Sequence, residues 1–208
     1  SYILILFLTG HSMIDQKEEM APLFALAYMS LIDEDRLNRW VKASFALGKV
    51  EPFFISTFQS LGRLDSRLVF FDKIIIKNLM KGDKGDLDFN AYTIEHLSQA
   101  TLWLFGAYEI IRVLNDKDFK KKPEMAIYNK YQPEIYSLKL KLARIRMPLA
   151  KFAPADKHKG DAHVPTPTFN ITHGVAWQIT ETEWIIRKEL SDEMLELLEK
   201  IFKETKTE

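Results

Sequence analysis

Apolar residues recur at helical spacing along most of the chain, and the pattern is clearest between residues 92 and 115. One face of this segment is lined by large side chains, namely Leu97, Leu104, Tyr108, Ile111 and Leu114. So wide an apolar face is typical of a helix in the middle of a bundle. Gln99, Glu109 and Arg112 interrupt the segment and argue against a membrane span.

A second helix is predicted from Pro133 to Met147, because the fixed φ of proline suits the first helical turn. Its main apolar stripe is Ile135, Leu138, Leu142, Ile145 and Leu149, and a second face is formed by Tyr136, Leu140, Ala143 and Met147. Pro148 is expected to kink or end the helix. We expect the helices of residues 92–115 and 133–147 to pack on each other and to be the two most buried elements.

The remaining helices are predicted from weaker patterns. Residues 13–50 indicate two helices, the second starting at the acidic run 33–35 and stopping at Gly48. Residues 51–82 are rich in Phe, Ile and Val, which favours strands, yet their spacing also fits a helix. We favour the helix because the neighbouring segments are helical, and we expect a loop at residues 81–90. The last helix is predicted to begin after Ser191, a good N-cap.

A small β structure is predicted before that last helix. Residues 153–167 form a loop, after which residues 169–172 and 175–180 alternate as two strands joined by a two-residue turn that ends at Gly174. Residues 182–188 add a third strand or begin the next helix. The fold class is therefore mainly α: a single-domain helical bundle, residues 13–208, with a small β-hairpin appendage near residues 168–187.

The first twelve residues are set apart from this domain. Their apolar run, residues 3–8, is too short to span a bilayer and lacks the basic start of a secretory signal. The letters GHSM precede Met13, so we interpret residues 1–12 as a vector-derived or disordered segment. If they are native, an added β-strand is the alternative.

Composition narrows the classes of function. The 208 residues include 29 Lys and Arg and 29 Asp and Glu, so the net charge is zero, whereas nucleic-acid binders usually carry a basic excess. The basic run at residues 117–123 is interpreted as a solvated loop, and nucleic acid is not an expected partner. There is no cysteine, which excludes disulfides, thiolate metal sites and a cysteine nucleophile. With no signal peptide recognised, we expect a cytoplasmic location.

The most unusual stretch, KHKGDAHVPTPTFNITHG at residues 157–174, holds three of the five histidines. His158, Asp161 and His163 have side chains of the kind that bind zinc, iron or manganese. However, Lys157 and Lys159 would repel a cation, and the spacing is not that of a helical metal site. We therefore predict a structured connector, held extended by its Val-Pro and Thr-Pro steps, with neither metal nor cofactor.

Charged residues on the apolar helices are the other candidates. Arg146 projects close to the apolar stripe of its helix, so it needs a partner, and Glu109 is the natural one, with a backbone carbonyl as second acceptor. A structural ion pair is the simpler interpretation. The catalytic alternative gathers Arg144, Arg146, Glu109, His158, Asp161 and His163 into a cluster that meets an anion.

Three functions are consistent with these features, and the sequence does not decide whether the protein is an enzyme. We expect a non-catalytic helical protein that binds a protein partner or itself, because no catalytic motif is present. The alternatives are a hydrolase or nuclease acting on a phosphorylated substrate through the basic helix end and the His/Asp loop, and a sensor that binds a small ligand between the helices.

Overall fold

The computed structural model describes residues 30–48, 51–81 and 87–205, and the side chains of residues 87–91 and 124 lie outside that description. The chain divides into two units, Ser1–Leu31 and Ile32–Glu208, and the fold below is that of the second unit. The segment of residues 1–12 and the helix predicted from residue 13 fall outside the described residues.

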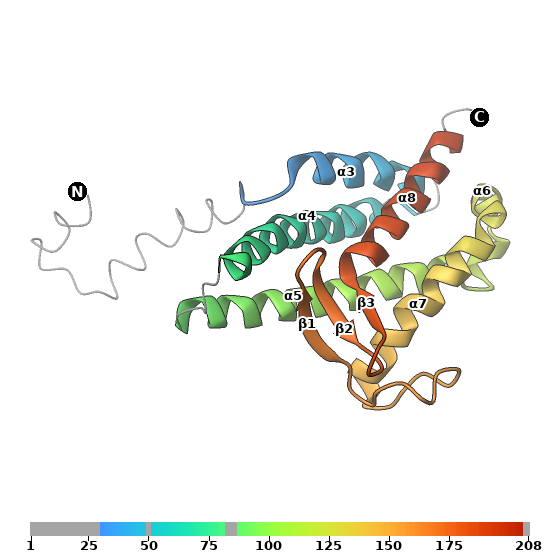
Figure 1. Cartoon of the computed structure of the whole chain (residues 1–208). Helices are drawn as coiled ribbons and strands as arrows, with labels where there is room; N and C mark the ends of the chain where they lie inside the picture. Colours follow the sequence, from blue (N-terminus) through green and yellow to red (C-terminus); the bar gives the residue numbers. More distant parts are fainter. Residues whose placement is uncertain (1–29, 49–50, 82–86, 206–208) are drawn as a thin grey trace, which may run out of the picture. The chain divides into compact units, whose positions relative to one another are not determined.

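The described chain is mainly helical (Figure 1), as the sequence predicts. The helices are α3 (Glu34–Gly48), α4 (Phe53–Met80), α5 (Leu87–Leu114), α6 (Ala126–Lys130), α7 (Gln132–Lys151) and α8 (Arg187–Thr205), with short 3-10 turns η1 (Phe119–Lys121) and η2 (Pro123–Met125) before α6. Helix α3 packs on α4 and α8, and α5 packs on α4 and α7. The expected packing of the two central helices is thereby confirmed.

Helix α4 resolves the ambiguous segment in favour of the helix. Its buried apolar side chains recur three and four residues apart, which gathers them on one side of a helix but would split them between the faces of a strand; they include Phe58, Leu61, Leu68, Phe71 and Ile75. Gly62 lets α3 approach closely, since a Cβ there would lie 2.4 Å from Cβ of Trp40. Long apolar runs can therefore be helical where the partner helices supply a surface to bury them.

Helices α5 and α7 differ from the predicted bounds. Helix α5 begins at Leu87, inside the predicted loop, and α7 continues through Pro148 to Lys151. It ends at Phe152, which is left-handed with φ 54° and whose amide donates to the carbonyl of Pro148 at 2.9 Å. Tyr136 and Leu140 are exposed, so only one of the two apolar faces of α7 is buried, and the expectation that α7 is among the most buried elements is wrong.

Three antiparallel strands form a sheet in the order β1 (Thr166–Asn170), β2 (Gly174–Gln178), β3 (Trp184–Ile186). The hairpin loop has three residues, not the predicted two, and the amide of His173 donates to the carbonyl of Asn170 at 3.3 Å. Gly174 follows with φ +84°, the left-handed residue that such loops need, so the role predicted for this glycine is confirmed.

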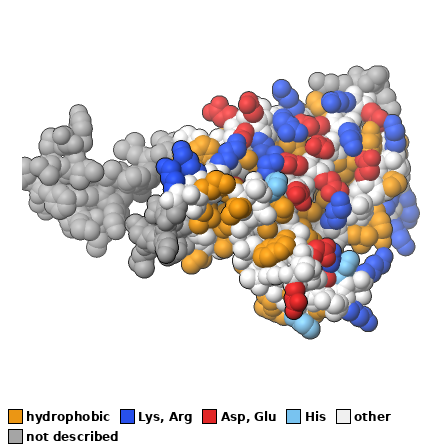
Figure 2. Space-filling view, in the orientation of Figure 1, with side chains coloured by type: hydrophobic (Ala, Val, Ile, Leu, Met, Phe, Trp, Pro, Cys, Tyr) orange, Lys and Arg blue, Asp and Glu red, His pale blue; other side chains and the backbone are white. Residues whose placement is uncertain are grey.

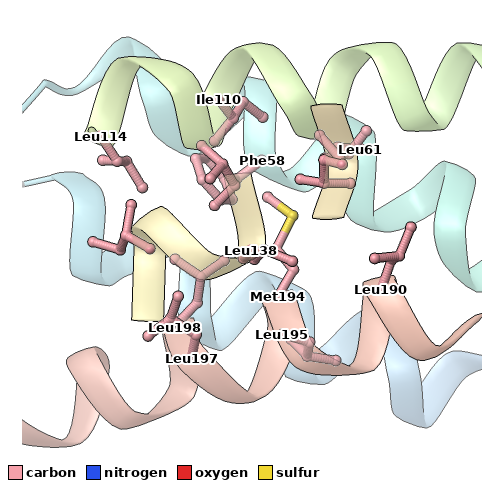
Figure 3. Close-up of a cluster of buried hydrophobic side chains, with 14 of the residues drawn as sticks. Phe58, Leu61, Ile110, Leu114, Leu138, Leu190, Met194, Leu195, Leu197 and Leu198 are labelled. Carbon is pink, nitrogen blue, oxygen red and sulfur yellow. The ribbon is translucent and has the colours of Figure 1, made fainter. Parts of the chain in front are cut away.

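The sheet buries one face. Because side chains alternate along a strand, Val175 and Trp177 of β2 point into the core, where Phe169 and Ile185 pack beside them, and Ala176 points the other way. The helical part of the core is drawn in Figure 3, where Met194 of α8 points toward Phe58 and Leu61 of α4. The inner sheet face thus completes the core, whereas the outer face is partly exposed, with Ala176 buried at its centre and Trp184 44% exposed.

Candidate functional site

Arg144 holds the loop of residues 153–165, which contains His158 and His163 and is called the histidine loop below, against the rest of the domain. Its guanidinium donates to both carboxylate oxygens of Asp161, at 2.6 and 2.9 Å, and to both of Glu183, at 2.6 and 2.7 Å. The hydrogen bonds from Arg144 hold the pKa of Asp161 below its ordinary value, although burial acts in the opposite direction. We call Arg144, Asp161 and Glu183 the Arg144 clamp. It joins α7, the loop of residues 153–165 and the β2–β3 turn.

The two loop histidines do not join this clamp by hydrogen bonds. His163 is exposed, and its Nδ1 lies 3.3 Å from the carbonyl oxygen of Phe152. His158 contributes backbone turns, donating to the carbonyl of Ala155 at 2.7 Å and accepting from the amide of Asp161 at 2.9 Å. Among the described residues no group of three or more His, Cys, Asp and Glu side chains could hold a metal ion.

Arg146 pairs with Glu109 as predicted, but the pair is partly exposed to solvent and not buried. Its Nη2 lies 3.4 Å from Oε1 of Glu109, and its guanidinium lies 5.0 Å from the ring centroid of Tyr108. The second acceptor is Sδ of Met147 at 3.5 Å and not a backbone carbonyl. The two side chains are 28% and 46% exposed, so the pair lies at the surface of α5 and α7.

The predicted catalytic cluster does not assemble as one group. Residues 144 and 146 are two positions apart, so they project about 200° from each other around a helix of 3.6 residues per turn. Arg144 contacts the loop and the sheet, whereas Arg146 contacts α5. The structure therefore brings Arg144 to Asp161 and Arg146 to Glu109, as two separate ion pairs.

A larger ionic cluster, which sequence reasoning missed, lies inside the bundle. Asp65 of α4 is fully buried and accepts hydrogen bonds from Arg187 at 2.5 Å and Ser191 at 2.6 Å. Trp40 donates to it at 2.8 Å, and Nε of Arg36 contacts the same carboxylate. Burial by itself raises the pKa of Asp65, but the charges of Arg187 and Arg36 outweigh it and hold the pKa below the ordinary value.

The cluster continues two turns along α4 to Asp72. Arg187 also donates to Asp72 at 3.1 Å, and Nε2 of His96 lies 2.8 Å from the other oxygen of that carboxylate. The imidazole stacks on Phe169 of β1, with ring centroids 5.7 Å apart. We call Arg36, Asp65, Asp72, His96, Arg187 and Ser191 the Asp65 cluster; it links α3, α4, α5 and α8.

One feature of the sequence could have revealed this cluster. Asp65 and Asp72 are seven residues apart, and they lie in helical phase with Leu61, Leu68 and Ile75, on the buried face of α4. Ser191, predicted to be an N-cap, lies inside α8, which begins four residues earlier at Arg187. The sequence assigned Ser191 to an N-cap and Arg187 to a third strand or the beginning of the next helix, so their burial inside α8 was missed.

The surface has hollows around the sheet. One of about 660 Å³ is lined by Asp161 and His163 of the loop and by residues 178–182. Two others, of about 600 and 290 Å³, flank the indole of Trp184, which is 44% exposed. None of the residues of the Asp65 cluster lines these three hollows.

The outer sheet face carries apolar side chains beside these hollows. Thr168, Ala176 and Ile186 lie side by side across the three strands, and Trp184 lies in the next row of the same face, opposite Gln178. Ile171 of the hairpin loop is 61% exposed at its end. Figure 2 shows hydrophobic side chains over the part of this face where the sheet lies, with acidic side chains close by. We call Ile171, Trp184 and Ile186 the Trp184 face; Ala176, between them, is fully buried.

Comparison with protein-family models, with curated proteins and with solved structures gives no match for this chain. Among the described helices, none is both long enough and apolar enough to cross a membrane. The candidate function must therefore be argued from the geometry of the chain itself.

Proposed function

We propose that this protein is a non-catalytic module that binds a partner protein through the Trp184 face, and that it works in the cytoplasm. The observation that carries the proposal is the exposed indole of Trp184 between two hollows of about 600 and 290 Å³. The chain has four tryptophans, and the other three, Trp40, Trp103 and Trp177, are fully buried. A half-exposed Trp beside pockets is the kind of residue that dominates binding energy at protein interfaces.

The catalytic alternative receives less support from the geometry. Arg144 of α7 is a cation that contacts the histidine loop, but it already meets the two carboxylates of Asp161 and Glu183. One positive charge against two negative charges leaves the clamp acidic, which repels a phosphorylated substrate. The clamp is better suited to holding the loop and the sheet in place than to binding an anion.

The sensor alternative requires an apolar pocket between helices. The hollow between α7 and α8 has a volume of about 200 Å³ and is lined mainly by polar and charged residues, among them Glu134, Glu193 and Lys200. Small-ligand sites are usually larger and mostly apolar. The Trp184 face therefore remains the better supported surface.

A photo-crosslinking experiment tests this proposal. Benzoylphenylalanine placed at position 171 of the whole chain, which lines the larger of the two hollows beside Trp184, is expected to give one dominant adduct on irradiation in cells. The mass of the adduct separates a foreign protein from a second copy of this chain. The matched control carries the same group at position 53, because Phe53 is also exposed but lies at the start of α4.

Two results would contradict the proposal. One is the absence of any adduct at position 171 when the variant is folded and present at the wild-type level. The other is an adduct of equal yield at position 53, since that would show contact without preference for the Trp184 face. Circular dichroism of the purified variants checks that both are folded.

A further inference from the structure

We propose that the occupant of the Trp184 face is a basic peptide segment of another protein, carrying a Lys or Arg beside an apolar side chain. The inference rests on the proposed function and adds the chemistry of the partner. It follows from three observations: the charge around Trp184, the unpaired state of Glu189, and the open face of the indole ring.

The first observation is an acidic excess around the indole. The smaller hollow is lined by the three carboxylates Glu183, Glu189 and Glu193 and by the two cations Lys141 and Arg144. Arg144 also neutralises Asp161, which lies in the neighbouring hollow. Four carboxylates thus face two cations, and a partner of positive charge would be attracted to this region.

The second observation is that one of the carboxylates lining the smaller hollow, which together form its acidic rim, has no counterion. Glu193 pairs with Lys141 at 2.7 Å, and Glu183 pairs with Arg144. Glu189 is exposed and makes no ion pair with any other residue that the structure describes. Lys188, the residue before it, pairs instead with Asp192 at 2.5 Å. Glu189 is therefore available to a cation from outside.

The third observation concerns the indole itself. No lysine or arginine of the described chain stacks on Trp184, although the buried Trp103 has Arg187 at 5.5 Å from its ring centroid. An exposed Trp ring attracts a Lys or Arg, and more strongly when a carboxylate is close enough to bind the same cation. Ile186 and Ile171, in the larger hollow, provide apolar contact for the neighbouring side chain of the peptide.

A second copy of this chain is a poorer occupant. In a symmetric dimer the same patch meets itself, so the acidic rims of two Trp184 faces would be brought together. Like charges across an interface oppose association. The acidic rim thus favours a foreign basic segment over self-pairing through this face.

The test is selection of peptides by the whole chain. A random heptapeptide display library is panned on the immobilised protein, and selected peptides are synthesised and titrated while tryptophan fluorescence is recorded. Trp184 is the one exposed tryptophan, so a blue shift of the emission and reduced quenching by acrylamide report contact at this face. We expect the selected peptides to contain Lys or Arg next to an apolar residue.

Variants assign the contacts. Trp184→Ala is expected to weaken binding about 30-fold, as for a hot-spot residue. Glu189→Gln should weaken it about two- to fivefold, the range of an exposed ion pair, and the effect should shrink in 0.5 M salt. Phe53→Ala and Glu196→Gln are the matched controls, since both residues are exposed and neither lines the hollows beside Trp184.

The outcomes separate the partner chemistry from the proposed function. Acidic or uncharged peptides whose binding needs Trp184 would overturn the basic partner and leave the Trp184 face as a binding surface. Peptides that bind equally to Trp184→Ala, or no selected peptide at all, would overturn the basic partner at this face. Concentration-dependent self-association that Trp184→Ala abolishes would replace the foreign segment by a second copy.

Discussion

Two ionic clusters of this molecule use the same residue types in different surroundings. The Asp65 cluster is buried, with Arg187 and Asp65 both 0% exposed, and every carboxylate in it meets an arginine. The Arg144 clamp lies closer to the surface, because Glu183 is 49% exposed and Arg144 is 17% exposed, although Asp161 is only 7% exposed. Water can replace a lost partner in the clamp but not in the buried cluster, so the same substitution has a different effect in each.

The two clusters also hold different parts of the fold. The Asp65 cluster joins four helices of the bundle and reaches β1 through the stacking of His96 on Phe169. The Arg144 clamp joins one loop and one turn to the side of α7. We therefore expect damage to the first to weaken the whole domain, and damage to the second to loosen the loop while the core is preserved.

The largest effect is expected for Asp65→Asn. The substitution leaves Arg36 and Arg187 buried without their shared counterion, which should lower the free energy of unfolding by about 3–5 kcal/mol. Urea denaturation measures the change, and Asp118→Asn is the control, because that side chain is 87% exposed and pairs only with Lys121. A loss below about 1 kcal/mol would show that water reaches the buried cluster.

The pH dependence of the free energy of unfolding, compared between the wild type and Asp65→Asn, gives a second test of the buried cluster. Because the pKa of Asp65 is lowered in the folded state, its contribution is complete above the ordinary value of 3.8 and is lost as the pH falls through the folded pKa. The wild-type free energy of unfolding should therefore fall more steeply than that of Asp65→Asn below about pH 4. Equal slopes would contradict the assigned direction.

Gly174→Ala should have the next largest effect. A Cβ at this position would lie 2.2 Å from Cγ of Asp72, and the residue has φ +84°. The clash and the left-handed backbone together should cost about 2–4 kcal/mol. Gly160→Ala is the control, since a Cβ there meets nothing within 4 Å, and thermal melts of the two variants should differ clearly. Matching melts would mean that the hairpin moves away from Asp72 without cost.

For the clamp we expect a smaller, local effect. Arg144→Met removes the hydrogen bonds to Asp161 and Glu183 and should lower the free energy of unfolding by about 1–2 kcal/mol. Hydrogen exchange should rise in residues 153–165 and stay unchanged in α4 and α5. Lys141→Met, which removes a single exposed pair with Glu193, is the comparison. Faster exchange throughout the core would show that the clamp supports more than the loop.

The smallest effect among the ion pairs is expected at Arg146. Arg146→Met leaves Glu109 at the surface, still paired with Arg112 at 2.6 Å. The free energy of unfolding should therefore change by less than about 1 kcal/mol, as for exposed pairs. A loss above about 2 kcal/mol in urea denaturation would place this pair with the buried cluster.

The sequence predicts where the helices lie better than it predicts which side chains pair between them. The spacing of apolar residues locates α5 and α7, and the X-Pro steps and Gly174 locate β1 and the hairpin, because these signals are local. The Asp65 cluster depends on which helices pack together: Asp65 and Arg187 are 122 residues apart. Pairing at that distance has no local signature, although the seven-residue spacing of Asp65 and Asp72 shows that both lie on one helix face.

The sequence likewise identified residues of the candidate site but not how they pair. Arg144, Asp161, Arg146 and Glu109 were all selected from the sequence, and the structure joins them as two ion pairs and not as one cluster. Trp184 was assigned only to a possible third strand. Its exposure depends on the order of the strands, which places it on the outer face while Trp177 of the neighbouring strand points into the core.

The central claim, that Trp184 is exposed for binding and not for stability, is tested most directly by adduct yield in a Trp184→Ala chain. Benzoylphenylalanine is placed at position 171, at the end of the Trp184 face, and irradiated in cells with residue 184 as Trp or Ala. We predict that the adduct is lost with Ala, while the free energy of unfolding changes by less than about 1 kcal/mol because the indole is half-exposed. An undiminished adduct, with a chain that unfolds more easily by over about 2 kcal/mol, would contradict the claim and make Trp184 a structural residue.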